Sequence, residues 1–262
     1  MSLLSFQSAL AYVIRSYDAH NTKSLDELTR LYDMTPEEVL TLENLINQQR
    51  LKAYSEELFL ARWTIIREAL EFLDPLVKLR DLCELFERDF EKKNITVVCE
   101  ELAFRFVEYL VQDPVGSKFI RTDTKPFLPD LLKYIQAVFA FRHNVLPKMS
   151  PRKHSLLTEQ CFVIVKLEYD VREFFAELME LEDFSDLNLK EPPCGDIILL
   201  FTSSDEVTEF RSFEIDQELT DFLEGQLRGE LPVVIPSCYD DLVDVGLCQQ
   251  RGIKRPCCNK TH

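Results

Sequence analysis

The sequence predicts an α+β protein in which an N-terminal helical bundle precedes a smaller module of strands and short helices. Two observations predict this class. Apolar residues recur at helical spacing in the first part of the chain, and the spacing then changes toward the two-residue alternation of strands. Between these parts, residues 144–154 contain two prolines and several basic residues, which is typical of a linker. We therefore expect domains at 1–146 and 155–248, followed by a basic, cysteine-containing tail at 249–262.

The first helices are predicted from their start signals. Residues 3–16 form a short amphipathic pattern, and residues 24–27 and 35–38 are capping boxes, the second with proline at the first helical position. The apolar pattern that follows extends to Leu73, which is long for one helix. We therefore expect a break near residues 49–54.

The rest of the bundle is predicted in the same way. Asp74 and Pro75 form an N-cap and proline pair, which predicts a helix from this point through Phe86. A second apolar stripe runs from Val98 to Leu110, and the Asp113–Gly116 turn signal ends it. After a proline-containing loop, residues 131–139 form the last helix expected in the bundle.

The second part of the chain contains the strands. Residues 161–169 are rich in β-branched and aromatic side chains and predict a strand, and residues 171–181 predict a helix. A continuous apolar run at 196–201 and a second run at 207–213 flank the turn residues 203–205, which predicts two antiparallel strands. The module therefore contains about three strands.

A helix is expected directly after the second of these two strands. Asp216 is its N-cap, Leu219, Phe222 and Leu223 form its apolar face, and it ends near Gly225 and Gly229. A small sheet with an available edge, backed by a short helix, suits an extended peptide that binds by strand addition. The alternative is that the chain covers its own edge, as proteins commonly do.

Composition argues against several functions. The chain has 46 acidic against 30 basic residues and a formal charge of −16, so its field repels nucleic acids and anionic membranes. Residues 25–39 have the rhythm of a helix-turn-helix, but Arg30 is their one basic residue, so we do not expect nucleic-acid binding. The absence of a long apolar run and of a positively charged leader predicts no membrane partner and a cytoplasmic location.

Catalytic and metal-binding patterns are also missing from the sequence. It contains no GxSxG, HExxH, P-loop or GxGxxG motif, and it has six glycines and four widely separated histidines. The tail holds Cys257, Cys258 and His262, but without a CxxC pair it does not predict a zinc site. We therefore predict no catalytic residues, no metal ligands, no cofactor and no enzymatic activity.

Three segments carry a resemblance to a known family. LPDLLKYIQAVFAF at 128–141, LEYDV at 167–171 and FEIDQELTDFLEGQLRG at 213–229 resemble partner proteins of multinuclear non-heme iron oxidative enzymes. These include the partner subunit of the 3-thiaglutamate pathway, and some members carry a DNA-binding family label. The C-terminal half is similar to the PqqD-like recognition element of ribosomal-peptide biosynthesis, which implies a winged-helix-like module. The resemblance implies a heterodimer in which the sister subunit holds the iron, while this chain binds a precursor peptide and presents its cysteine for modification.

Candidate binding residues follow from the expected edge strand and from the excess of aromatic residues. Alternate positions of the strand, and a helix face that closes the groove, predict a peptide-binding set: Val207, Glu209, Arg211, Phe213, Tyr239, Leu242, Val243 and Val245. Aromatic residues near the domain junction predict a partner interface: Phe141, Phe174, Phe175 and Phe184. The alternative function is a stand-alone regulatory or adaptor protein without a peptide substrate, with nucleic-acid binding as its weaker form.

Overall fold

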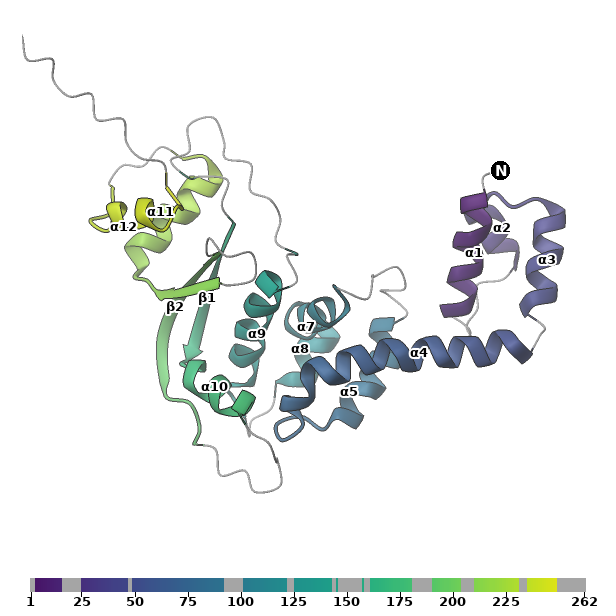
Figure 1. Ribbon diagram of the computed structural model, residues 1–262, viewed down its shortest axis with the longest axis horizontal. Helices are drawn as coiled ribbons and strands as arrows, with labels where there is room; N and C mark the ends of the chain where they lie inside the picture. The colour runs from purple at the N-terminus through teal and green to yellow at the C-terminus, as the bar shows by residue number, and fades with distance from the viewer. Residues whose placement is uncertain are drawn as a thin grey trace, which may run out of the picture. The chain divides into compact units, whose positions relative to one another are not determined.

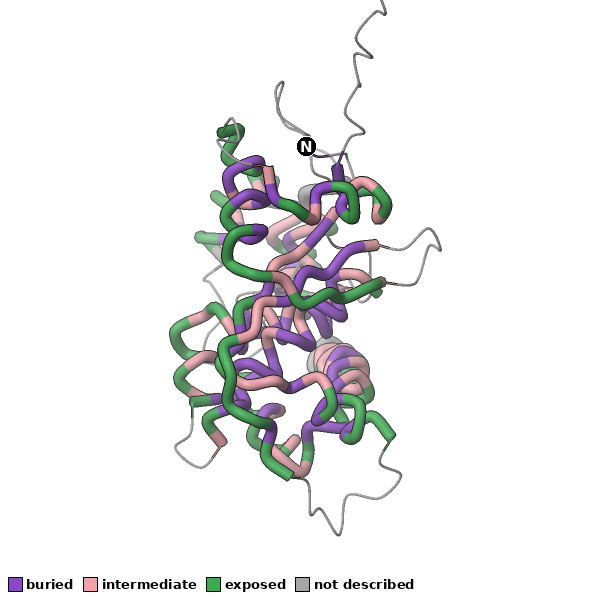
Figure 2. Tube along the Cα trace, turned by 90° about the vertical axis from the view of Figure 1, so that its left-hand side faces the viewer, coloured by how far each residue is buried: buried purple, intermediate pink, exposed green. Residues whose placement is uncertain are grey.

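The structure, a computed structural model, contains helices and one antiparallel sheet, which confirms the α+β class. The residues that it describes are 3–15, 25–46, 49–91, 101–121, 125–142, 145, 157, 161–180, 190–203, 210–230 and 235–248. Buried and exposed positions alternate along most of the helices, as expected for amphipathic elements (Figure 2). None of the helices in these ranges is both long and apolar enough to cross a membrane.

The chain divides into two compact units. The first comprises Met1–Leu132 and Phe175–Leu189, and the second comprises Lys133–Phe174 and Lys190–His262. The division passes within two helices, α9 (Leu128–Arg142) and α10 (Arg172–Glu180), so each contributes residues to both units. The domains expected at 1–146, 155–248 and 249–262 stay a prediction, and the tail at 249–262 lies outside the described residues.

The first unit begins with three helices, α1 (Leu3–Arg15), α2 (Leu25–Tyr32) and α3 (Pro36–Ile46), which share a small apolar core (Figure 1). The predicted capping box at the start of α3 is confirmed. The Thr35 amide donates to Glu38 Oε2 at 2.8 Å, and the Glu38 amide donates to Thr35 Oγ1 at 3.4 Å. The hydrogen bonds that the Thr35 amide and the Thr35 hydroxyl donate to this carboxylate lower the pKa of Glu38. The reciprocal pairing explains why the helix starts at Pro36. The start predicted at Ser24 lies outside the described residues.

Two helices replace the long pattern that extends to Leu73, but residues 49–54, where a break was expected, lie within the second helix. The first helix, α3, ends at Ile46, and the second, α4 (Gln49–Leu70), continues into the 3-10 helix η1 (Glu71–Leu73). Phe59 of α4 packs into an aromatic cluster with residues of η2 (Phe86–Phe90) and α7 (Leu102–Gln112). Beside this cluster Arg62 Nε lies 2.9 Å from Glu91 Oε1, and both side chains are buried. An ion pair withdrawn from water in this way depends on close geometry.

Two helix boundaries in the first unit differ from the prediction. The helix expected from Asp74 starts later, as α5 (Leu79–Leu85), because Asp74 Oδ1 accepts a hydrogen bond from the amide of Leu79 at 2.9 Å. Asp113 and Pro114, expected to lead into a loop, instead begin another helix, α8 (Pro114–Ile120), in which Asp113 Oδ1 accepts from the Val115 amide at 2.9 Å. Asp113 is thus the N-cap of α8, whereas Asp74 lies five residues before the first amide of α5, whose N-cap position is Lys78.

The second unit contains the sheet, whose described strands have the order β1-β2-β3. All three strands were predicted, and their bounds are β1 (Phe162–Tyr169), β2 (Cys194–Ser203) and β3 (Phe210–Glu214). Both pairings are antiparallel, with Ile164 opposite Leu200 and Leu200 opposite Phe213. β2 is therefore the central strand, which explains its continuous apolar sequence, since both of its faces are covered.

Helices cover both faces of this sheet (Figure 1). On one face, Phe162 and Leu200 share a core with α11 (Gln217–Arg228) and α12 (Tyr239–Asp244). On the other face, Tyr134 of α9 packs edge-to-face on Phe201, with ring centroids 5.4 Å apart. We refer to these as the α11 face and the α9 face. The alternation of side chains along a strand places neighbouring residues of β2 on opposite faces.

Helix α11 has the predicted start, and it ends at the second of the two glycines near which an end was predicted. Asp216 is its N-cap, and its Oδ1 accepts from the Leu219 amide at 2.8 Å, as predicted. The helix passes through Gly225 and stops at Gly229, whose φ of 78° places it in the left-handed region. Gly225 is buried within the helix, whereas Gly229 supplies the backbone conformation that ends it.

Candidate functional site

β3 is the more exposed of the two outer strands. Four of its five residues are exposed and Phe210 is half-buried, whereas β1 has buried residues at three positions. In addition, the main-chain carbonyl of Lys166 in β1 accepts a hydrogen bond from Lys133 Nζ at 3.5 Å. Among the described residues, no strand other than β2 pairs with β3. The outer edge of β3 is therefore the part of the described sheet best placed to receive another chain.

The register determines which main-chain groups of β3 face outward. The amide of Ile215 donates to the carbonyl of Ile198 at 2.9 Å, so these two residues form a hydrogen-bonded pair. Hydrogen-bonded and non-hydrogen-bonded pairs alternate along an antiparallel ladder. Arg211 and Phe213 therefore direct their amides and carbonyls toward β2. Phe210, Ser212 and Glu214 direct theirs away from β2, and these three residues make up what we call the outer edge of β3.

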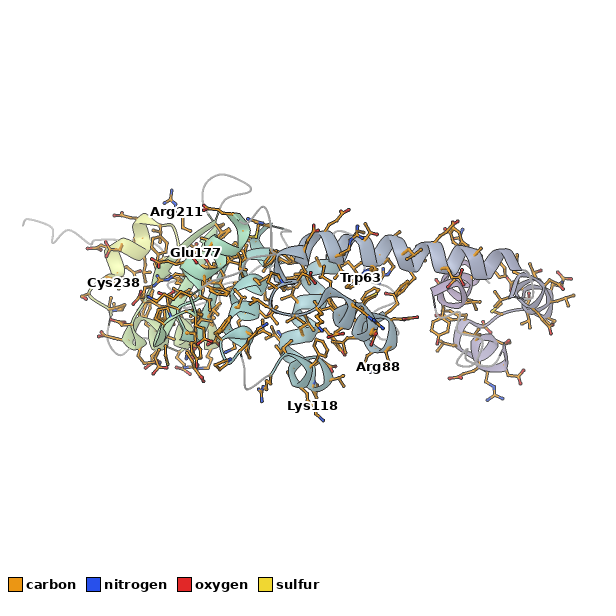
Figure 3. All side chains as sticks on the ribbon, turned by 90° about the horizontal axis from the view of Figure 1, so that it is seen from below. Trp63, Arg88, Lys118, Glu177, Arg211 and Cys238 are labelled. Atoms are coloured by element: carbon orange, nitrogen blue, oxygen red, sulfur yellow. The ribbon has the colours of Figure 1, made fainter. Side chains whose placement is uncertain are left out.

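Side chains of β3 lie alternately on the two faces of the sheet. Phe213 lies opposite Leu200 and therefore on the α11 face, together with Arg211. Arg211 extends away from the ribbon (Figure 3). Phe213 is 36% exposed, so part of its ring is open to a guest chain on this face. Phe210, Ser212 and Glu214 lie on the α9 face.

An arginine fixes one end of the outer edge. Arg172, at the start of α10, forms a bidentate ion pair with Asp170, in which Nε–Oδ1 is 2.8 Å and Nη2–Oδ2 is 2.7 Å. The same Nη2 also donates to Glu214 Oε2 at 3.1 Å. The hydrogen bonds from Arg172 hold the pKa of Asp170 below its ordinary value, and those to Asp170 raise the pKa of Arg172. We call Asp170, Arg172 and Glu214 the Arg172 cluster.

The predicted peptide-binding residues separate into four pairs. Arg211 and Phe213 lie on the exposed strand, as expected, whereas Val207 and Glu209 lie outside the described residues. Tyr239 and Leu242 are 5% and 4% exposed and belong to the core beneath the sheet. The remaining two, Val243 and Val245, are half-buried against the same core. The last four residues therefore attach α12 to the sheet, and their part in peptide binding stays a prediction.

The aromatic residues predicted to form a partner interface also separate. Phe141 of α9 is half-buried, and its ring centroid lies 6.0 Å from that of Phe210 at the outer edge. Phe174 and Phe175 are both buried, and Phe175 packs edge-to-face on Phe72. Phe184 lies outside the described residues. Phe141 thus remains partly accessible beside the strand, while Phe174 and Phe175 contribute to cores.

Potential metal ligands do not converge in the part of the chain that the structure describes. No group of three or more histidine, cysteine, aspartate or glutamate side chains there is arranged to hold a metal ion. All four histidines lie outside the described residues. Burial raises the pKa of the Cys248 thiol to about 11, so this cysteine behaves as a core residue.

Sequence reasoning missed two components of this site. It identified side chains of β3 but not Ser212, whose outward main-chain groups are the centre of the outer edge. It also missed Arg172, although Asp170 and Arg172 are neighbours in the sequence, because the third partner, Glu214, is 42 residues away. Comparison of the chain with protein-family models and with curated protein sequences found no match.

Proposed function

We propose that the outer edge of β3 binds an extended peptide by strand addition, and that the protein recruits this peptide for modification by another subunit. The observation that carries this proposal is the set of outward main-chain groups of Phe210, Ser212 and Glu214, which no described residue pairs as a strand. Strand addition uses such groups for affinity and the flanking side chains for specificity.

The resemblance noted in the sequence supports the rest of the proposal. It implies that the module is winged-helix-like and belongs to the recognition elements of ribosomal-peptide biosynthesis. The partner is then a cytoplasmic multinuclear iron enzyme that forms a heterodimer with this non-catalytic chain. The mechanism is positional. Holding the peptide beside the partner's metal centre raises the effective concentration of its reactive cysteine without any chemistry on this chain.

The energy available from the main chain sets the scale of binding. Each hydrogen bond contributes about 0.5–1.5 kcal/mol net, and three outward residues offer a small number of such bonds. Part of this gain offsets the entropy lost when an extended peptide becomes ordered. Affinity therefore depends on side-chain contacts on both faces of β3, and a peptide that lacks them binds weakly.

A proline at Ser212 tests the proposal. Ser212→Pro removes one outward N–H and leaves the ladder to β2 intact, whereas Arg211→Pro would break that ladder. Tagged wild-type, Ser212→Ala and Ser212→Pro proteins are used as baits in extracts of the native cell, and mass spectrometry identifies retained peptides and iron-containing proteins.

Strand addition predicts a peptide that wild type and Ser212→Ala retain and Ser212→Pro loses. An iron-containing partner should remain on all three baits, because the substitutions at Ser212 leave Phe141, the accessible residue of the predicted partner interface, unchanged. Equal retention of the peptide by Ser212→Pro would exclude the edge as its binding site. If none of the three baits, wild type included, retained an iron-containing protein, the proposed heterodimer would be excluded.

A further inference from the structure

We infer that the outer edge of β3 selects its peptide by a pattern of apolar and charged residues, an inference that rests on the proposed function. The guest strand runs antiparallel to β3. It places apolar residues opposite Phe210 and Phe213, an acidic residue opposite Arg211 and a basic residue opposite Glu214.

Geometry links each guest residue to one face of the sheet. Residues directly opposite each other on neighbouring strands place their side chains on the same face, close enough to interact. A guest residue opposite Arg211 or Phe213 therefore lies on the α11 face. One opposite Phe210, Ser212 or Glu214 lies on the α9 face. The five residues of β3 consequently define five positions of the guest.

The α11 face of β3 offers one charge and one apolar surface. No described acidic residue pairs with Arg211, and its guanidinium extends away from the ribbon (Figure 3). Phe213 is 36% exposed, although it lies beside an apolar core. An acidic guest residue would pair with Arg211, and an apolar one would cover Phe213. Both contacts would satisfy groups that the described residues leave open to solvent.

On the α9 face the apolar surface comes first along β3 and the charge comes second, which is the reverse of the α11 face. At one end, the half-buried rings of Phe210 and Phe141 pack on each other and on the fully buried ring of Phe201, with Phe210 and Phe201 5.8 Å apart. At the other end lies the Arg172 cluster, in which two carboxylates accompany one guanidinium. Two carboxylates and one guanidinium give the cluster a net charge of about −1. It favours a basic guest residue opposite the exposed carboxylate of Glu214.

The guest is inferred to be antiparallel because antiparallel pairing is slightly more stable per residue than parallel pairing. In this direction one guest residue exchanges two hydrogen bonds with the outward amide and carbonyl of Ser212. Read from its N-terminus, the guest core is then basic, apolar, small polar, acidic, apolar. Lys-Val-Thr-Glu-Phe is one sequence of this pattern.

Two synthetic peptides of identical composition test the pattern. Each carries a fluorophore and serine flanks, and their cores are Lys-Val-Thr-Glu-Phe and the charge-swapped Glu-Val-Thr-Lys-Phe. Fluorescence anisotropy at low salt measures their binding to the full chain. Because the swap turns two attractive cross-strand pairs into repulsive ones at exposed positions, we expect about five- to tenfold weaker binding of the swapped peptide.

An Arg211→Glu variant reverses one of these pairs without altering the cores. It should bind a peptide with lysine in the fourth position, Lys-Val-Thr-Lys-Phe, more tightly than Lys-Val-Thr-Glu-Phe, with wild type showing the opposite order. Ser212→Pro should weaken all of the peptides. An unchanged preference in Arg211→Glu would overturn the inference.

The peptide preference tests the residue pattern, and the Ser212→Pro variant tests the edge itself. If the peptides bind with equal affinity and Ser212→Pro abolishes their binding, the edge binds peptides but the pattern is wrong. If Ser212→Pro binds every peptide as wild type does, or if neither core binds, the proposed edge is wrong and the inference fails with it.

Discussion

Proline substitutions at two adjacent positions of β3 have very different consequences if its outer edge is free. The amide of Phe213 faces β2, where its partner Leu200 is only 1% exposed. Phe213→Pro removes that donor and leaves a buried carbonyl unsatisfied, which costs about 1–3 kcal/mol, with backbone strain in addition. We therefore expect the unfolding free energy of the second unit to fall by about 2–4 kcal/mol. Ser212→Pro removes a donor that faces outward, and the fall should stay below about 1 kcal/mol.

Alanine variants at the same positions and hydrogen exchange within the sheet separate main-chain effects from side-chain effects. Ser212→Ala and Phe213→Ala measure the side-chain effects, so the difference between each proline and its alanine reports the main chain. Hydrogen exchange of the β2 amides measures the opening of the second unit. The single tryptophan, Trp63, lies in the first unit, and its fluorescence should show the same unfolding transition in all variants. A loss for Ser212→Pro as large as that for Phe213→Pro would mean that the Ser212 amide is already bonded within the protein.

Further predictions concern side chains away from this edge. Replacing Arg62 with methionine should destabilise the first unit by about 3–5 kcal/mol in urea unfolding, because the buried Glu91 carboxylate loses this ion pair. Adding Glu91→Leu should recover most of the loss, and a double variant no more stable than the single would contradict this reading. The lowered pKa of Asp170 means that its contribution to stability is present above the ordinary aspartate pKa and is lost as pH falls through the lowered value. Asp170→Asn should therefore reduce stability by about 1 kcal/mol at pH 7 and flatten its dependence on acid, and a variant with an unchanged pH profile would argue against the pair. Peptide mapping after brief alkylation at pH 8 should find exposed Cys194 modified well before Cys248, because burial raises the pKa of the Cys248 thiol to about 11. Equal rates of alkylation would contradict the burial of Cys248.

Local signals in the sequence were sufficient for much of the fold. The capping box at residues 35–38 and the N-cap at Asp216 each involve residues three apart, so the sequence alone contains both partners. β2 was predicted from its continuous apolar run, which suits a strand buried on both faces, and β1 from its β-branched and aromatic residues. The helix after Asp113 was missed, although the same N-cap and proline signal occurs at residues 35–36, where it was read correctly.

The candidate site depended on long-range structure. Which amides of β3 face outward is set by the register with β2, and a shift of one residue would exchange Ser212 for Phe213. The contact between Arg172 and Glu214 joins residues 42 positions apart, and the buried pair of Arg62 and Glu91 joins residues 29 apart. Tyr239 and Leu242 were assigned to a groove because an amphipathic pattern shows which face is apolar. It does not show whether that face contacts the protein's own core or a partner.

Amide hydrogen exchange along β3 in the free protein tests the central claim most directly. A free outer edge predicts rapid exchange at Phe210, Ser212 and Glu214 and slow exchange at Arg211 and Phe213, with Ile215, which bonds to Ile198, as the protected reference. Addition of the Lys-Val-Thr-Glu-Phe peptide should then slow the rapid class. Protection of Ser212 equal to that of Phe213 before any peptide is added would contradict the account.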